Sequence, residues 1–231
     1  MKKIGIIGGL GPESTVDYYR GIVETFRVGQ GGLAGPEMVI YSADVDKLFE
    51  RIEAAQGESL VDWLLERVCA LQRAGAQFAA IGANTPHIVF DKVQARSPIP
   101  LLSIVEETFR RAEALGIKRF GLMGTRSTMQ SDFYQKSFEA GGISVVVPRT
   151  DEIEHIHNRL ISEIELGIIK DSTREELLSI VKRMRDEDSI QALILGCTEL
   201  PMILDKEEYG IPFLNTTAIH IEAIVRYCVG T

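Results

Sequence analysis

The sequence predicts an α/β protein made of two similar halves, each a small parallel sheet flanked by helices. Short apolar segments alternate with amphipathic ones along the 231 residues, which is typical of parallel strands connected by helices. The pattern then starts again, because residues 118–125 (KRFGLMGT) repeat the pattern of residues 2–9 (KKIGIIGG). Two more pairs follow in the same order and at nearly the same spacing: Gly196-Cys197 with Gly82-Ala83, and Ile211-Pro212 with Ile99-Pro100. Matched pairs in one order indicate an internal duplication.

The first half begins with an apolar strand at residues 3–9, which ends in a glycine turn. Glu13-Ser14-Thr15 supply capping residues for the helix that follows, and a loop is expected at 29–35. A second amphipathic helix is predicted over 59–73 from apolar residues at helical spacing. The other strands are expected at 37–42, 77–81 and 99–103, and in the second half at 118–125, 190–194 and 211–214.

The duplication also predicts a domain organisation. We expect two lobes related by a pseudo-twofold axis, with the active site in the cleft between them and with Ala83 and Cys197 opposite one another. The matched Ile-Pro segments are predicted crossing points, so that each fourth strand would join the opposite lobe. The first lobe would then contain residues 1–98 and 211–231, and the second lobe residues 99–210.

The amino-acid composition argues against several classes of partner and cellular location. A net charge of −8 argues against nucleic acid or an anionic membrane as a partner. The three cysteines are odd in number and widely spaced, which indicates a reducing compartment rather than a disulfide framework or structural zinc. The apolar run at residues 4–7 is too short for a signal-peptide core or a membrane span. We therefore expect a cytoplasmic protein.

Two cofactor types are disfavoured by the motifs. Residues 5–11 (GIIGGLG) do not fit GxGxxG in register, and GxxxxGK[ST] is absent, so a nucleotide site is not expected. His155 and His157 lie two residues apart without a metal-binding pattern around them, so no metal is expected either. A helix N-terminus that holds a carboxylate remains compatible with the glycine turn.

The clearest candidate for chemistry is Cys197. It follows the apolar run at 190–195 and Gly196, so it is predicted at the carboxyl end of a buried parallel strand, where open α/β sheets place their ligands. A helix beginning just after it would lower the pKa of the thiol through its dipole and free amides. A buried apolar cysteine is the alternative. Small and polar neighbours (Gly196, Thr198, Glu199) favour the reactive interpretation.

These motifs together resemble the aspartate/glutamate racemase family, in particular its amino-acid racemase branch. The matching segments span nearly the whole chain in the family's order: Gly8-Gly9 with Ser14-Thr15, Asn84-Thr85-Pro86-His87, Gly124-Thr125-Arg126-Ser127-Thr128, Gly196-Cys197-Thr198-Glu199 and Thr216-Thr217-Ala218-Ile219-His220. The resemblance implies a cofactor-independent isomerase of two α/β domains that acts on a small acidic amino acid and is usually a homodimer. It also implies one cysteine at each of two equivalent strand ends, on opposite faces of the substrate α-carbon.

The chain departs from this pattern at Ala83, the position of the family's first cysteine. A methyl group cannot transfer a proton, so Cys197 is the acid/base group left of the pair, and Cys228 lies in an apolar segment. Three explanations stay open. The enzyme could perform one-base chemistry, as relatives that resemble arylmalonate decarboxylase do. Another group or a water could serve the second face, or Ala83 could be an engineered substitution.

The remaining site candidates are polar residues at the strand ends. The α-carboxylate of a substrate would suit hydroxyl, amide and backbone N–H donors, since the developing carbanion needs them. Lys47 and Arg126 are the candidate cations for a side-chain carboxylate, although an exposed salt bridge is the alternative for each. His87, Glu199 and His220 are expected to support the site or simply to pack. The donors are Gly9, Asn84, Thr85, Thr125, Ser127, Thr128 and Thr198.

The leading function from sequence is therefore an amino-acid racemase for aspartate or glutamate. One alternative is a one-cysteine decarboxylase or cis–trans isomerase of a dicarboxylic acid. Another is a small-acid binding protein that has lost turnover together with its first thiol.

Overall fold

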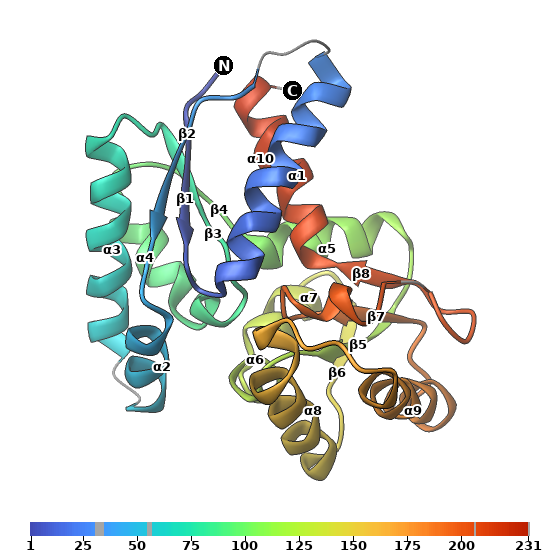
Figure 1. Ribbon diagram of the computed structural model, residues 1–231. Helices are drawn as coiled ribbons and strands as arrows, with labels where there is room; N and C mark the ends of the chain where they lie inside the picture. The colour runs from blue at the N-terminus through green and yellow to red at the C-terminus, as the bar shows by residue number, and fades with distance from the viewer. Residues whose placement is uncertain (31–34, 55–56, 206, 231) are drawn as a thin grey trace. The chain divides into compact units, whose positions relative to one another are not determined.

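The computed structural model describes residues 1–30, 35–54, 57–205 and 207–230, and in this part of the chain it contains two four-stranded parallel sheets (Figure 1). The predicted loop at 29–35 falls largely on residues outside the described ones. Both sheets have the same strand order, with the second strand of each half at one edge, then the first, third and fourth. The α/β class is confirmed, and the shared order is what an internal duplication produces.

The first sheet has the order β2-β1-β3-β4. Its strands are β1 (Ile4–Gly8), β2 (Met38–Ser42), β3 (Phe78–Ile81) and β4 (Leu101–Leu102). Ile4 lies beside Met38 on one side and Phe78 on the other, and β1 and β3 are buried along their whole length. Continuous apolar strands of this kind need cover on both faces of the sheet.

Helices supply this cover from two sides (Figure 1). One core cluster joins Ile7 to α2 (Val45–Glu53), α3 (Gly57–Arg73) and α4 (Phe90–Arg96). The other joins Ile4 and Ile6 to α1 (Pro12–Gln30) and α10 (Thr216–Val229). The short 3-10 helix η1 (Thr85–Val89) follows β3, and α5 (Ile104–Ala114) follows β4.

The second sheet has the order β6-β5-β7-β8. Its strands are β5 (Arg119–Met123), β6 (Ser144–Val146), β7 (Ala192–Leu195) and β8 (Phe213–Asn215). One core cluster packs this sheet against α8 (Thr150–Ser162) and α9 (Asp171–Asp188). The remaining elements of this half are α6 (Arg126–Gln130), α7 (Phe133–Glu139), and the 3-10 helices η2 (Ile164–Leu166) and η3 (Leu200–Met202).

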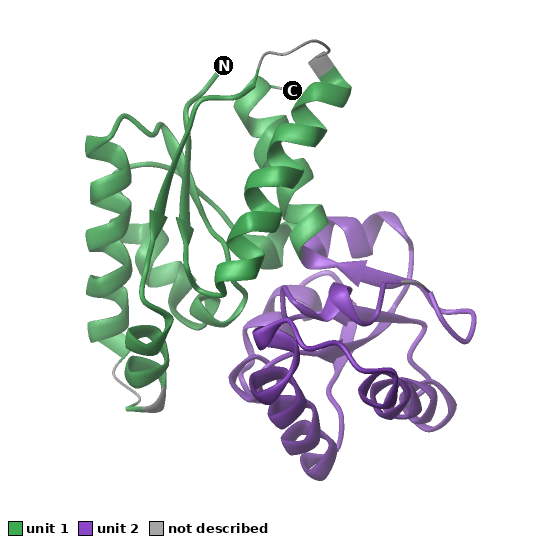
Figure 2. Ribbon diagram, in the orientation of Figure 1, with its two compact units in different colours: residues 1–107, 217–231 green, residues 108–216 purple. Residues whose placement is uncertain are grey.

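The chain divides into two compact units, Met1–Glu107 with Thr217–Thr231 and Thr108–Thr216 (Figure 2). These boundaries differ from the predicted ones at 98/99 and 210/211. The prediction that each fourth strand joins the opposite lobe was wrong, because β4 pairs with β3 and β8 pairs with β7. The backbone explains this, since the N–H groups of Ala79 and Leu193 donate to the carbonyls of Pro100 and Pro212, at 2.9 and 3.0 Å. The Ile-Pro segments thus extend each half's own sheet, and the division falls in the helices that follow.

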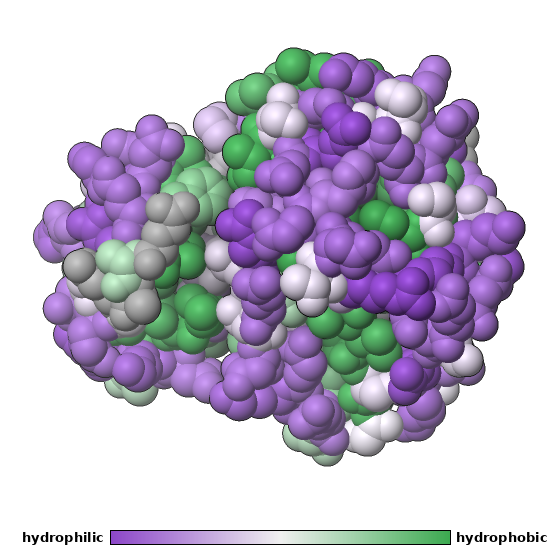
Figure 3. Space-filling view, turned by 90° about the horizontal axis from the view of Figure 1, so that it is seen from below, coloured by the Kyte–Doolittle hydropathy of each residue, from purple (hydrophilic) through white to green (hydrophobic). Residues whose placement is uncertain are grey.

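Hydrophilic side chains predominate on the molecular face in Figure 3. None of the helices in the described ranges is long and apolar enough to cross a membrane.

Candidate active site

The carboxyl edge of the second sheet brings Thr125 and Cys197 to neighbouring strand ends. Met123 of β5 lies beside Leu195 of β7, and the Gly196 N–H donates to the Met123 carbonyl at 2.7 Å. The strand ends are so close that a Cβ on Gly124 would lie 2.8 Å from the Gly196 carbonyl oxygen. Glycine at both positions therefore allows the two polar turns to meet.

The Thr125 hydroxyl serves as the cap of α6. It accepts a hydrogen bond from the Thr128 N–H at 3.3 Å, and the two threonine hydroxyls lie 3.1 Å apart. Two residues before Cys197 in the sequence, the Leu195 carbonyl accepts a hydrogen bond from the Thr216 hydroxyl at 2.8 Å. These threonines hold the turns after β5 and β7 in place, which is a positioning role for part of the predicted donor set.

Cys197 itself lies against two carboxylates. Its side chain is buried, and the thiol donates to Glu199 Oε2 at 3.0 Å. The Thr198 hydroxyl donates to the same oxygen at 2.8 Å. Glu165, from η2, places Oε1 3.9 Å from the Cys197 sulfur. Sequence reasoning missed Glu165, because it lies in a turn far from the strand-end motifs.

Burial and the neighbouring charges overturn the expected pKa of the Cys197 thiol. Burial, followed by the Glu199 and Glu165 charges, raises the pKa of Cys197 well above its ordinary value. The Glu199 N–H opposes this effect, but the following helix η3 has only three residues. The expected lowering therefore does not occur, and Cys197 is a protonated thiol at neutral pH. Burial, followed by the Glu199 charge, also raises the pKa of Glu165 to about 7.

In the first unit, Ala83 occupies the equivalent strand end, one residue beyond Gly82 after β3. Its methyl group is buried, and its carbonyl accepts from His87 Nδ1 at 3.0 Å. The other ring nitrogen of His87 accepts the Ile104 N–H at 3.3 Å, and the ring stacks on Phe90. Burial lowers the pKa of His87 to about 4, so it is neutral and positions the turn that contains Ala83.

His220 plays a similar bracing role. Its Nε2 donates to the Leu102 carbonyl at 3.1 Å, and its Nδ1 accepts from the Tyr18 hydroxyl at 2.8 Å. Burial, followed by the neighbouring His87, lowers the pKa of His220 to about 3. The ring is thus neutral and connects α10 to α1 and β4. Of the two expectations for His220, support of the site and simple packing, these contacts fit packing.

The glycine turn after β1 is built around Thr15. Gly9 has φ +75°, and a Cβ there would lie 2.2 Å from the Ala43 carbonyl oxygen, so only glycine fits. The Gly9 N–H donates to the Thr15 hydroxyl at 2.7 Å. Ser14 donates to the Gly82 carbonyl at 3.2 Å and links this turn to the one before Ala83. The Gly9 amide is therefore engaged within the protein rather than free for a substrate.

Comparison with known proteins now identifies the family. A model described as Asp/Glu/Hydantoin racemase matches residues 7–224. The chain belongs to the Asp/Glu/Hydantoin racemase family. Membership makes it an enzyme of the isomerase type.

Individual relatives match nearly the whole chain. It is 26% identical over 218 residues to the broad specificity amino-acid racemase RacX of Bacillus subtilis (strain 168), with 93% of each chain covered. A crystal structure of a putative Asp/Glu racemase from Yersinia pestis is 32% identical and superposes with a TM-score of 0.90, covering 99% of this chain and 100% of that one. An aspartate racemase homologue from Pyrococcus horikoshii OT3 is 35% identical, with a TM-score of 0.83 and the same coverage.

The two cations predicted to meet a substrate carboxylate have partners within the racemase chain. Arg126 makes a two-point ion pair with Glu154 of α8, at 2.7 and 2.5 Å. Lys47, at the start of α2, is exposed and lies 3.7 Å from Asp44. Both therefore fit the salt-bridge alternative.

The Cys197 cluster is also the one group among the described residues that could hold a metal ion. The sulfur and one oxygen each of Glu165 and Glu199 lie within 4.8 Å of one another. A thiolate and carboxylates suit Zn²⁺, but the thiol would first have to lose its proton. Its 3.0 Å contact with Glu199 is that of a hydrogen-bonded thiol.

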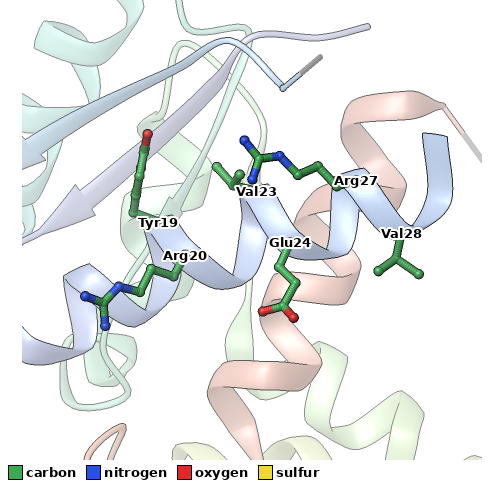
Figure 4. Close-up of a pocket in the computed structure, with 6 residues that line it drawn as sticks. All are labelled: Tyr19, Arg20, Val23, Glu24, Arg27 and Val28. Carbon is green, nitrogen blue, oxygen red and sulfur yellow. The ribbon is translucent and has the colours of Figure 1, made fainter. Parts of the chain in front are cut away.

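A separate hollow lies on the outer face of α1 (Figure 4). Its lining comes from this one helix: Tyr19, Arg20, Val23, Glu24, Arg27 and Val28. With neither a thiol nor a strand end in this lining, the hollow does not resemble an acid/base site.

Proposed function

We propose that the protein transfers a proton at the α-carbon of an amino acid, with Cys197 as the acid/base group. The carrying observation is the buried thiol hydrogen-bonded to Glu199 at the carboxyl edge of the second sheet. Family membership supplies the reaction class. Aspartate and glutamate are the first substrates that the family's description suggests, and no added cofactor is required.

Glu199 gives Cys197 a route to act as a base. The thiol proton passes to Glu199 Oε2, 3.0 Å away, so that the S–H bond breaks and an O–H bond forms. The resulting thiolate then takes the α-proton of the substrate. The proton returns along the same path, or the thiol delivers a proton directly to the carbanion.

The carbanion requires hydrogen-bond donors at the substrate carboxylate. The proposed donors are the polar side chains and N–H groups at the strand ends. For Thr125 and Thr128, whose hydroxyls bond to each other, the contribution is to position the turn. In the second unit the proposed substrate-contacting side chain is Ser127, because the Thr198 hydroxyl donates to Glu199.

With alanine at position 83, the proposed proton transfer is limited to one face of the substrate α-carbon. A methyl group provides neither an acid nor a base, so inversion is expected to be slow, while exchange of the α-proton with solvent needs one group alone. The same observation favours the second candidate function, a one-cysteine decarboxylase or cis–trans isomerase of a dicarboxylic acid.

The test is NMR in D2O with both enantiomers of aspartate and glutamate, with a malonate-type diacid and maleate as probes of the second candidate. Replacement of the α-proton by deuterium is expected, and Cys197→Ser should abolish it. Cys69→Ser is the matched control, because Cys69 lies on α3 away from the strand ends. Exchange that persists in Cys197→Ser would refute the acid/base role. Absence of exchange together with turnover of a diacid would replace the first proposal by the second.

Two further expectations remain predictions: the homodimer, which the family resemblance implies, and the cytoplasmic location, which the cysteine pattern and the short apolar run at residues 4–7 indicate. A homodimer would give twice the chain mass in light scattering, and a cytoplasmic enzyme should need no oxidising conditions to fold.

A further inference from the structure

The charge around Cys197 is negative, which is unusual for a site that would bind an acidic amino acid. Glu199 Oε2 lies 3.0 Å and Glu165 Oε1 3.9 Å from the sulfur. Glu199 receives hydrogen bonds from both Cys197 and Thr198. Glu165, by contrast, contacts the sulfur at the longer distance and is only partly covered.

Nearby cations are used by another carboxylate. Glu163 accepts from Lys170 at 3.0 Å, from Arg159 at 2.8 Å and from the Thr173 hydroxyl at 2.5 Å. The Thr173 and Lys170 hydrogen bonds lower the pKa of Glu163 to about 2. Within the described ranges, burial, Glu199 and Cys197 are the influences on the pKa of Glu165, and none of them is a cation. Glu165 is therefore a carboxylate beside the thiol without compensating positive charge.

The reaction requires Glu165 to lie close to any substrate. A reacting sulfur approaches the α-carbon to about 3–3.5 Å. Since Glu165 Oε1 is 3.9 Å from that sulfur, it lies within about 7 Å of the α-carbon, which is within reach of a substrate side chain. At this separation, and with the intermediate dielectric of a partly buried site, a unit charge on that side chain changes binding by roughly 10- to 100-fold.

We propose that Glu165 sets the charge selectivity of the site, so that amino acids with a cationic side chain are preferred over aspartate and glutamate. This inference rests on the proposed α-proton transfer and reverses the acidic preference that the family's description suggests. Glu165 acts here as a specificity-determining group, and Cys197 remains the group that moves the proton.

The first test uses the unmodified protein and three probes of similar length: glutamate, glutamine and lysine. Their side chains carry negative, zero and positive charge, so a ranking by charge is separated from one by size. At pH 8, where Glu165 with its pKa of about 7 is mostly ionised, we expect kcat/KM for α-proton exchange in D2O to fall from lysine to glutamine to glutamate, with lysine favoured over glutamate by at least about tenfold. If the three exchange and glutamate equals or exceeds lysine, the charge selectivity is wrong and the proposed function stands. If none exchanges, both proposals are refuted.

The second test uses Glu165→Gln, which keeps the shape and removes the charge. The lysine-to-glutamate ratio should fall by about tenfold or more, while glutamine changes little. Glu175→Gln is the matched control, because Glu175 is an exposed carboxylate of α9, and the ratio should stay as it is. Circular dichroism confirms that both variants are folded, and the comparison of the three probes in the unmodified protein stands without them.

Two other results would overturn the proposal. An equal loss for all three probes in Glu165→Gln would mean that Glu165 holds the α-ammonium group, which they share. Loss of exchange on adding EDTA, with recovery on adding Zn²⁺, would mean that the carboxylates and the thiol bind a metal ion instead.

Discussion

Replacing Ala83 by cysteine should convert one-sided proton exchange into racemisation. Ala83 is buried at the end of β3, and its carbonyl is held by His87 at 3.0 Å, so the backbone there does not depend on the side chain. The substitution adds a single sulfur atom to an existing Cβ. A positioned acid or base contributes roughly 10²–10⁴-fold in rate, which corresponds to about 2.7–5.5 kcal/mol of the activation barrier.

The substitution also has a structural cost, which is separate from its effect on rate. Adding a group to a packed position typically costs about 1–3 kcal/mol of stability. A urea titration of Ala83→Cys measures that cost directly. The racemisation assay follows the conversion of each enantiomer of the best exchanging amino acid by chiral chromatography, alongside α-proton exchange in D2O.

Two results separate the possible explanations. If the new thiol and Cys197 act as a pair, Cys197→Ser in the Ala83→Cys background should remove the whole gain, since residues that work as a unit are not additive. The reasoning is refuted if the unmodified protein already inverts its substrate as fast as it exchanges the α-proton and Ala83→Cys changes neither rate. Another group or a water would then serve the second face.

Three further predictions concern the buried groups. Because burial and two carboxylates raise the pKa of Cys197, iodoacetamide should label it more slowly at pH 7 than the partly exposed Cys69, as measured by peptide mass spectrometry. His220→Ala should lower the free energy of unfolding by about 3 kcal/mol or more, since it opens a cavity and removes the hydrogen bonds that His220 makes to the Tyr18 hydroxyl and the Leu102 carbonyl. The unfolded chain binds protons at His220 and His87 below pH 6.5, whereas the folded protein keeps both neutral down to about 3 and 4. Stability should therefore fall as the pH drops from 7 to 5, by about 2 kcal/mol for each histidine. Glu165 opposes this trend, because its raised pKa costs stability as the pH rises from 4.5 to 7, so the titration is made in Glu165→Gln.

Each of these has a control. If iodoacetamide labels Cys197 faster than Cys69, and an added amino acid slows that labelling, the pKa of Cys197 is low, as the sequence predicted. His155→Ala should change stability by less than about 1 kcal/mol, because the side chain is 41% exposed and pairs with Glu176 at the surface. A stability that stays constant between pH 7 and 5 in the Glu165→Gln variant would show that the two buried histidines accept protons in the folded state.

Local patterns were sufficient for the α/β class, for the internal duplication and for the position of Cys197 at a strand end. Strand β1 ends in Gly8 and its repeat β5 is followed by Gly124, and apolar runs bounded in this way predict buried parallel strands. Cys197 could be placed at a strand end for the same reason, because the polar turn after β7 is adjacent in sequence. The alanine at position 83, where the family has its first cysteine, is likewise visible in the sequence alone.

Only the tertiary structure decided what surrounds the thiol. Glu165 precedes Cys197 by a whole helix and a strand, and it reaches the sulfur because η2 follows α8 at the same edge of the sheet. The pKa of Cys197 was misjudged for this reason: a dipole argument uses neighbours in sequence, whereas burial and through-space charge depend on residues brought together by folding. The pairing of β4 with β3 was misjudged in the same way. A strand of two residues has too few side chains to specify its sheet, and the available backbone edge decides where it pairs.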